Sequence, residues 1–371
     1  MTGLHRLWAI SLAVALSLQL RLGYAFAYNR TSFPGFGLSP NIGPKMRVSI
    51  QVGDCGRREL DTIQDAYMGT LDVIEAARRR LAALEPIIKS KPSGNSMMAG
   101  IERSTMYTYE TLFGTIYRGR TADNSQVFNR LDYVLGEAIN PALEPLSSVR
   151  FNELTIAIDI YRKLEDGFRG HPIELWCHDR YLTKEFPPEF FFPINYPDNK
   201  REETYWDSRP ENRWGQRARY RPSRCTGSIL ASPTPDETGE RPFDLLKVCP
   251  PWFENRWFAE ASLFNIRGQR WGRREKHLNE YWAHLSVVLT HEITHSHIIL
   301  GYKATQDIVG QRSAYGYQEA NYHATTNPEM AIRNADNYAL FALAMYLDAY
   351  DWSLGANDPM YDDGPMNAPI D

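Results

Sequence analysis

The residues best suited to chemistry lie in the stretch LSVVLTHEITHSHIIL, which contains His291, Glu292 and His295. Two histidines four positions apart fall on one face of a helix, where their ring nitrogens can reach the same zinc ion. Glu292 lies beside them and could take a proton from a water held by that zinc, because zinc lowers the pKa of such a water to about 7. The spacing therefore predicts attack of water on a peptide carbonyl. The alternative is an ordinary helix with two surface histidines.

The residues around this stretch indicate that the helix is buried. Leu285 and the run Val287–Leu289 precede the histidines, and Ile298–Leu300 follow them. Apolar residues on both sides are typical of a helix that crosses a core, and we expect it to run from about Glu280 to Leu300. His297 points to the other side and is expected to be a polar core or surface residue.

Two downstream segments, DIVGQRSAYGYQEANYH and NADNYALFA, and the histidine helix together resemble the aspzincin metallopeptidases, the deuterolysin and lysine-specific metallo-endopeptidase group of fungi. In that family HExxH is followed by a GTxxDxxYG loop and an NADSYA-like helix. LLKVCPPWF is similar to the family's cysteine-proline-aromatic segment. The resemblance covers about residues 50–180 and 245–350. It implies an α+β, zincin-like domain, mostly helical with a small mixed sheet, and a secreted zinc endopeptidase of fungal type acting on proteins or peptides.

The resemblance also implies roles for single residues. His291 and His295 would bind Zn²⁺, Glu292 would be the general base, and Tyr315 would steady the developing oxyanion. The family's aspartate, which supplies the third ligand, should lie three residues before Tyr315. That position is Arg312 in this chain, and a guanidinium has no lone pair to offer a metal.

Another group must then supply the third bond, or the site is impaired. Asp307, five residues before Arg312, is the predicted ligand, and Glu319 is an alternative. A site with two histidines only, or with no metal, is a further alternative. Asp336, in the NADNYALFA segment, is expected to be structural or to support a ligand from outside.

These alternatives lead to two further functional hypotheses. One is a degenerate relative that keeps the fold and binds zinc or a partner without proteolysis. The other is a carbohydrate-binding or structural wall protein, which would suit the 12% aromatic residues but explains neither the histidine pair nor Tyr315-Gly316.

The N-terminus has the pattern of a secretory signal peptide over residues 1–27. An apolar run from Leu7 to Leu18 is too short to span a bilayer and is followed by the cleavage pattern Ala25-Phe26-Ala27. The alternative is an uncleaved anchor. We expect residues 28–46 to be an irregular leader or short propeptide, residues 47–354 to form the metallopeptidase domain, and residues 355–371 to be a polar tail.

The charge balance argues against nucleic acid and membrane partners. The whole chain has a formal charge of -4, and residues 1–27 contain two arginines and no acid, so the remainder is mildly acidic with no basic block. We expect a secreted monomer.

Four cysteines, an even number without a C-x-x-C pair, predict two disulfides, with three pairings possible. On the family resemblance, Cys55 and Cys177 fit the first disulfide. The predicted pairing is therefore Cys55–Cys177 and Cys225–Cys249.

Hydrophobic periodicity predicts the remaining elements. We expect helices over residues 58–84, 106–117 and 328–350, the last with Asn327 as its N-cap, and a strand over 172–177. Residues 151–165 fit a strand or a helix. Residues 184–245 show no period and form either a long surface insertion or ordered loops pinned by Cys225 and Cys249.

Overall fold

The computed structural model describes residues 31–34, 47–50, 55–89, 100–114, 118–120, 127–129, 147–170, 173–208, 218–220, 225, 231–234, 244–254, 263–267, 276–308, 315–348, 352 and 355. The predicted signal peptide and most of the predicted leader and tail lie outside these residues. None of the described helices has the length and apolar character needed to cross a membrane.

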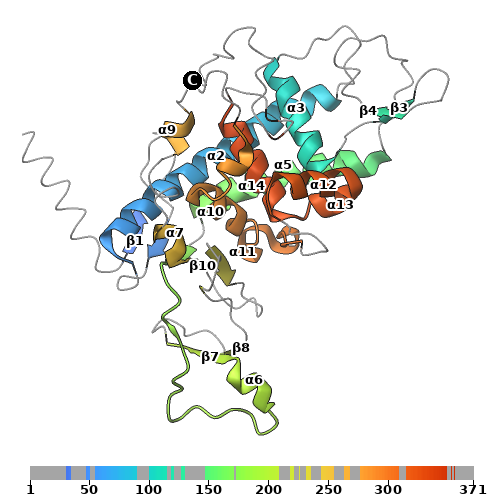
Figure 1. Ribbon diagram of the computed structural model, residues 1–371. Coiled ribbons are helices and arrows are strands. Elements are labelled where there is room, and N and C mark those ends of the chain that lie inside the picture. Colours follow the sequence, from blue (N-terminus) through green and yellow to red (C-terminus); the bar gives the residue numbers. More distant parts are fainter. Residues whose placement is uncertain are drawn as a thin grey trace, which may run out of the picture.

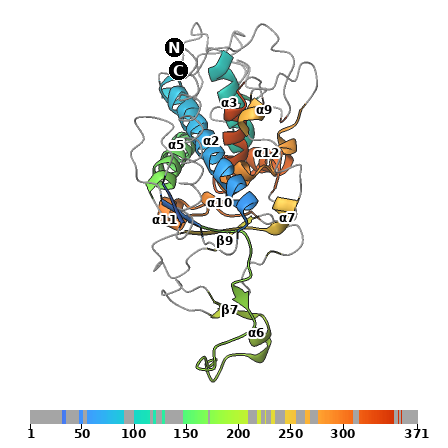
Figure 2. The same ribbon diagram turned by 90° about the vertical axis from the view of Figure 1, so that its left-hand side faces the viewer.

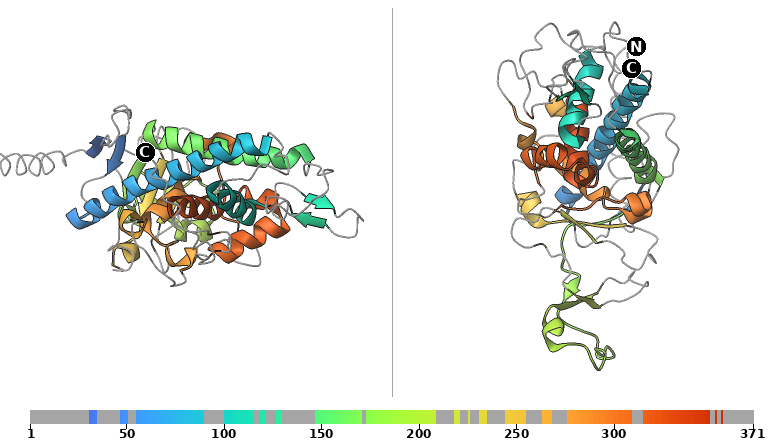
Figure 3. Two further views of the ribbon diagram at one scale, coloured as in Figure 1. Left: turned by 90° about the horizontal axis from the view of Figure 1, so that it is seen from above. Right: turned by 90° about the vertical axis from the view of Figure 1, so that its right-hand side faces the viewer.

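A long helix, α2 (Arg57–Lys89), organises the helical body (Figures 1 and 2). Its predicted apolar positions are buried, including Ile63, Ile74, Ala77 and Leu81. The helix packs against α5 (Ser147–Gly170), and the two run beside each other when seen from above (Figure 3). The prediction of a helix over residues 58–84 is confirmed.

The ambiguous segment 151–165 is helical. Within α5, Leu154, Ala157, Tyr161 and Leu164 recur at helical spacing and are buried, so packing of this face decides the conformation. The second predicted helix, α3 (Gly100–Phe113), begins and ends several residues earlier than expected.

Two further helices complete the core. The helix α10 (Leu285–Ile293) contains His291, and α14 (Ala335–Tyr346) lies against both α10 and α2; every residue of these two helices is buried. Aromatic rings join α14 to α3 and α5: Phe113 and Tyr161 both lie within 5.5 Å of Tyr338, measured between ring centroids.

A five-stranded mixed sheet covers one end of the body. Its order is β1 (Thr31–Pro34), β2 (Arg47–Ile50), β5 (Ile173–Trp176), β10 (Asp244–Val248) and β9 (Ala231–Thr234). The pairs β2–β5 and β5–β10 are parallel, and the two edge pairs are antiparallel. β5 confirms the predicted strand. The expectation of an irregular leader is wrong at residues 31–34, because their backbone pairs with β2.

Part of the predicted insertion forms a small antiparallel sheet that projects away from the helical body (Figures 1 and 2). It consists of β6 (Leu182–Thr183), β7 (Thr204–Asp207) and β8 (Ala218–Tyr220), with the short helix α6 (Asp198–Glu202). Five rings pack against one another here: Phe186, Phe190, Phe192, Tyr196 and Trp206. Strands of two to four residues are too short to show a period, so hydrophobic periodicity could not predict them.

The predicted helix over residues 280–300 is divided. A short 3-10 turn, η2 (Leu278–Glu280), precedes α10, and α11 (His297–Leu300) and η3 (Gly301–Lys303) follow it. The break arises because the Thr294 hydroxyl donates back to the His291 carbonyl and the Ser296 hydroxyl accepts from the Ile299 amide as a new N-cap. The continuous helix was therefore a wrong prediction.

The predicted helix over residues 328–350 is also divided. Asn327 caps α13 (Pro328–Ala331) as expected, by accepting from the Met330 amide. The chain then turns at Asn334, whose backbone is extended, before α14 begins.

An unpredicted helix, α12 (Tyr317–Thr326), fills the preceding segment and packs against α3. Smaller described elements are a hairpin of β3 (Arg118–Arg120) and β4 (Val127–Asn129), α7 (Pro250–Glu254) and α9 (Leu263–Arg267).

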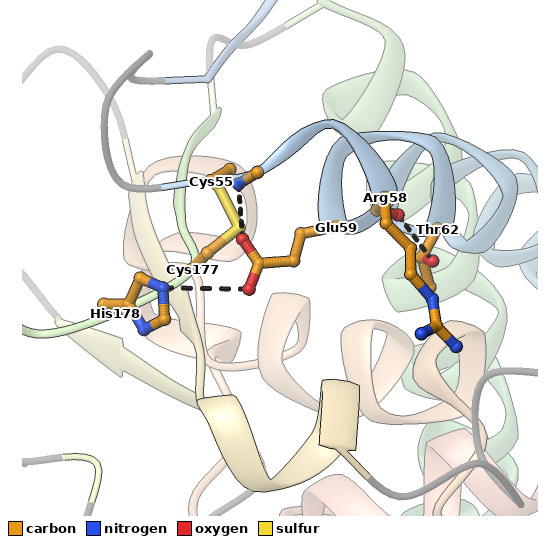
Figure 4. Close-up of a disulfide and its surroundings, with 7 residues drawn as sticks. Cys55, Arg58, Glu59, Thr62, Cys177 and His178 are labelled. Atoms are coloured by element: carbon orange, nitrogen blue, oxygen red, sulfur yellow. Dashed lines mark hydrogen bonds and ion pairs between the residues drawn. A yellow bond between two sulfur atoms is a disulfide. The ribbon is translucent and has the colours of Figure 1, made fainter.

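Both disulfides have the predicted pairing. Cys55–Cys177 joins the start of α2 to the end of β5, and Figure 4 shows Glu59 beside it, reaching from α2 toward His178. Cys225–Cys249 joins residues 24 positions apart, next to the end of β10. Gly355, the first residue of the expected polar tail, is bonded to the helical body, since its carbonyl accepts from the Leu278 amide.

Replacing Cys55 and Cys177 together with serine is expected to lower the free energy of unfolding by about 2–5 kcal/mol. The bridge closes a loop of 122 positions, whereas Cys225–Cys249 closes one of 24. The chain-entropy difference makes the first bridge worth about 1.4 kcal/mol more than the second. Denaturant unfolding of both double-serine variants measures this, and a larger loss from the shorter bridge would contradict the expectation.

Candidate metal centre

The histidine helix is held in place by close contact with α2. Gly69 of α2 faces Ser286 of α10, and a Cβ atom at Gly69 would lie 2.4 Å from the Ser286 hydroxyl oxygen. The next residue, Thr70, donates its hydroxyl to the Ser286 carbonyl. The absence of a side chain at Gly69 therefore lets the two helices approach and fixes the depth at which His291 lies.

His291 and His295 turn the same ring nitrogen toward a common point. Their Nε2 atoms lie 3.3 Å apart. The Nδ1 atom of His291 contacts Asp336 Oδ1 at 2.8 Å, and that of His295 contacts the Thr305 carbonyl at 3.0 Å. Because both partners are acceptors, each Nδ1 carries the proton and each Nε2 keeps its lone pair for a metal.

Asp307 completes the group. Its Oδ1 atom lies 2.9 Å from His291 Nε2 and 3.4 Å from His295 Nε2. This oxygen is buried and has no hydrogen-bond partner, as expected of an oxygen that binds a cation. Among the predicted third ligands, the structure thus brings Asp307 to the histidines; Glu319 lies half-buried in the first turn of α12. Arg312 lies outside the described residues.

These three atoms match the dimensions of a zinc site. Two ligand atoms of a tetrahedral zinc, each about 2.0–2.1 Å from the metal, are about 3.3–3.4 Å apart. The observed separations among the two Nε2 atoms and Asp307 Oδ1 are 3.3, 2.9 and 3.4 Å. Three protein donors on one face of a tetrahedron leave the fourth position open, as in catalytic zinc sites.

Glu292 also lies close to the two histidines. Ligand atoms of His291, Glu292 and His295 all lie within 4.8 Å of one another. Glu292 is buried, and its Oε2 atom has no hydrogen-bond partner. A buried carboxylate oxygen without a partner is costly unless it acts on something that enters the site.

The charged groups at this site shift one another's pKa values. Burial would lower the pKa of His291, but contacts with Asp307 and Asp336 raise it well above the usual value. Burial would raise the pKa of Asp307, but the two imidazoles lower it well below its usual range. For Glu292, burial raises the pKa of the carboxyl, and the nearby imidazoles oppose that rise. A bound cation would favour the ionised carboxylates and the neutral imidazoles.

Tyr315 lies at the edge of the site, with its ring centroid 5.8 Å from that of His291. The phenol is about half exposed, and burial together with the charge of Asp307 and a hydrogen bond to it raises its pKa well above 10. The phenol therefore keeps its proton at neutral pH and can donate a hydrogen bond.

Asp336 connects this edge of the site to His291. While Oδ1 contacts His291, Oδ2 accepts from the Gly316 amide. Gly316 has a φ of 88°, which favours glycine, and the amide of the following residue donates to Asn279 Oδ1. The bonds of the two following residues, Gly316 to Asp336 and Tyr317 to Asn279, therefore hold the backbone next to Tyr315 in place.

Sequence reasoning missed three groups at this site: Asn279, the Thr305 carbonyl and Asn334. No sequence signal could reveal a backbone carbonyl. Asn334 could have been noticed as an asparagine directly before a helix. His297 is exposed, as expected for a residue that is not a ligand.

Part of the chain, including this site, is similar to a known protein family. A family model described as lysine-specific metallo-endopeptidase, of the aspzincin group, matches residues 275–343. The chain thus resembles this family of zinc metallopeptidases over the region that contains the site, and the match supports zinc as the cofactor. No curated protein sequence matches the chain. Among solved structures, a zinc peptidase from Grifola frondosa is similar at 13% identity, over 78% of this chain and 96% of that chain, with a TM-score of 0.32.

Proposed function

We propose that this chain, which resembles the aspzincin family, is a zinc endopeptidase in which His291, His295 and Asp307 hold the metal. The observation that carries this proposal is the triangle of Nε2, Nε2 and Oδ1 atoms, whose sides are 3.3, 2.9 and 3.4 Å. The Glu292 Oε2 atom, which has no hydrogen-bond partner and lies beside that triangle, supports hydrolysis rather than a purely structural metal. The two disulfides are compatible with a secreted protein, and we propose proteins or peptides as substrates and a monomeric state.

Zinc, when bound, supplies Lewis acidity that activates water and polarises a carbonyl. Glu292 Oε2 would accept the proton of the attacking water and return it to the nitrogen of the departing amine. This role fits a carboxylate that is buried and makes no other hydrogen bond through that oxygen. Burial also raises the pKa of Glu292, which makes the carboxylate a stronger base than an exposed one.

Tyr315 would donate its phenolic proton in a hydrogen bond to the oxygen on which negative charge develops. Its raised pKa keeps the proton on the phenol at neutral pH. Asp336 contacts His291 and also accepts from the Gly316 amide. These two contacts would keep Tyr315 near His291, a proposed metal ligand. We propose this role for Tyr315 because its ring lies close to that of His291 and because its phenol keeps a proton to donate.

Dialysed protein is expected to contain close to one equivalent of zinc and to lose peptidase activity when a chelator removes it. His291→Ala and His295→Ala should abolish zinc retention, because each leaves only two protein donors. His297→Ala is the matched control, since this histidine is exposed two residues beyond His295. Elemental analysis and cleavage of a denatured protein measure both properties.

Full zinc retention after both site histidines are replaced would remove the metal centre from the proposal. Zinc binding by a wild-type protein that never cleaves would instead favour the catalytically degenerate relative.

A further inference from the structure

The segment that delivers Asp307 is fixed from two sides. On the side of α10, the Thr305 amide donates to the Thr294 carbonyl at 2.8 Å, and the hydroxyls of these two threonines are hydrogen-bonded. On the side of α14, Gln306 forms an isolated parallel bridge with Asn334. The Gln306 amide donates to the Arg333 carbonyl, and the Gln306 carbonyl accepts from the Ala335 amide.

Asn334 adds a side-chain bond to this bridge. Its Oδ1 atom accepts from the amide of Ile308, the residue directly after Asp307, at 3.4 Å. Asn334 is the N-cap residue of α14, yet its side chain makes no capping hydrogen bond to that helix. An N-cap asparagine normally turns its oxygen toward its own helix, as Asn327 does toward Met330. The oxygen of Asn334 is therefore directed to the Asp307 segment.

The other end of the Asn334 amide is anchored in the core. Its Nδ2 atom donates to Asn337 Oδ1, and Asn337 Nδ2 donates to the carbonyls of Leu112 in α3 and Ala320 in α12. Both asparagines are completely buried. A buried, satisfied amide pair of this kind has one arrangement, so it holds Ile308 at a defined place relative to three helices.

This anchor explains how Asp307 can replace the residue at the expected position. Seven residues separate Asp307 from Tyr315, where the family pattern that the chain resembles has two between its aspartate and its tyrosine. A short connection to Tyr315 therefore does not position Asp307. The contacts of its two neighbours with Arg333, Asn334 and Ala335 supply that placement instead.

We propose that Asn334 is a positioning residue, which sets the Asp307 carboxylate against the two histidines through the Ile308 amide. This inference rests on the proposed function only in treating Asp307 as a metal ligand. Asn334 itself touches neither metal nor substrate. Its loss is expected to weaken zinc binding about 10–100-fold, the effect typical of partners that orient ligands.

The test is a double-mutant cycle on the full chain, with zinc affinity measured by chelator competition. Asn334→Ala should cost about 10–100-fold in the wild-type background and less than about 3-fold when Asp307 is already asparagine, because the two residues act as one unit. Asn327→Ala is the matched control, since it removes an ordinary helix cap and should leave zinc affinity unchanged.

A second measurement addresses the same inference without metal. Hydrogen exchange at the Ile308 amide should accelerate in Asn334→Ala but not in Asn327→Ala. A wild type that holds no zinc would contradict the proposed function, while the exchange data would still decide the role of Asn334. Equal losses of affinity in both backgrounds, or unchanged exchange at Ile308, would overturn the inference.

Discussion

Asp307→Ala is expected to lose most of its zinc affinity and all peptidase activity. The substitution removes the oxygen that lies 2.9 Å from His291 Nε2 and 3.4 Å from His295 Nε2. Two imidazoles then remain, and two protein donors do not hold a catalytic zinc. The loss should exceed the roughly 10–100-fold that follows when a partner outside the ligand set is removed.

Zinc titration beside cleavage of a denatured protein substrate gives both quantities for each variant. Glu319→Ala and Arg312→Ala serve as controls, and both should keep the metal. These controls separate the predicted ligand from the other acid and from the residue at the family's expected position. An Asp307→Ala protein that binds zinc and cleaves like wild type would overturn the ligand assignment.

The fold could be predicted where one face of an element packs over many turns. The apolar positions of α2 from Ile63 to Leu84 recur over about six turns, and the structure buries them as expected. The breaks at Thr294 and Asn334 could not be predicted in the same way. Besides the local bonds of Thr294 and Ser296, each break is held by a hydrogen bond whose partner lies elsewhere in the sequence: Thr294 with Thr305, and Gln306 with Arg333 beside Asn334.

The candidate site could likewise be predicted from the sequence only in part. The i,i+4 spacing of His291 and His295 predicts that they share a metal, and the family resemblance predicts the region in which a third ligand should lie. The contact of Asp307 with both rings depends on how Gln306 and Ile308 pair with the start of α14. Such pairing is a property of the folded chain, so the sequence could offer Asp307 and Glu319 only as alternatives.

Glu292→Gln is expected to keep zinc and to lose turnover. Glutamine has nearly the same shape as glutamate, so the buried helix should pack as before, and none of the three proposed ligand atoms is altered. An amide cannot accept and return a proton, however, and the unpartnered Glu292 Oε2 is the atom that we propose for this transfer. Loss of general-base catalysis typically costs about 10²–10⁴ in rate.

The informative result is the separation of the two properties. Zinc content close to one equivalent, with kcat and kcat/KM both reduced by about 10² or more, would show that Glu292 acts in the transition state rather than in metal or substrate binding. His297→Ala again provides a matched control on the same stretch of chain, since this exposed side chain should affect neither zinc nor kcat. Loss of zinc from Glu292→Gln would make Glu292 part of the ligand set. Turnover equal to wild type would mean that another group moves the proton, because the amide at residue 292 could not.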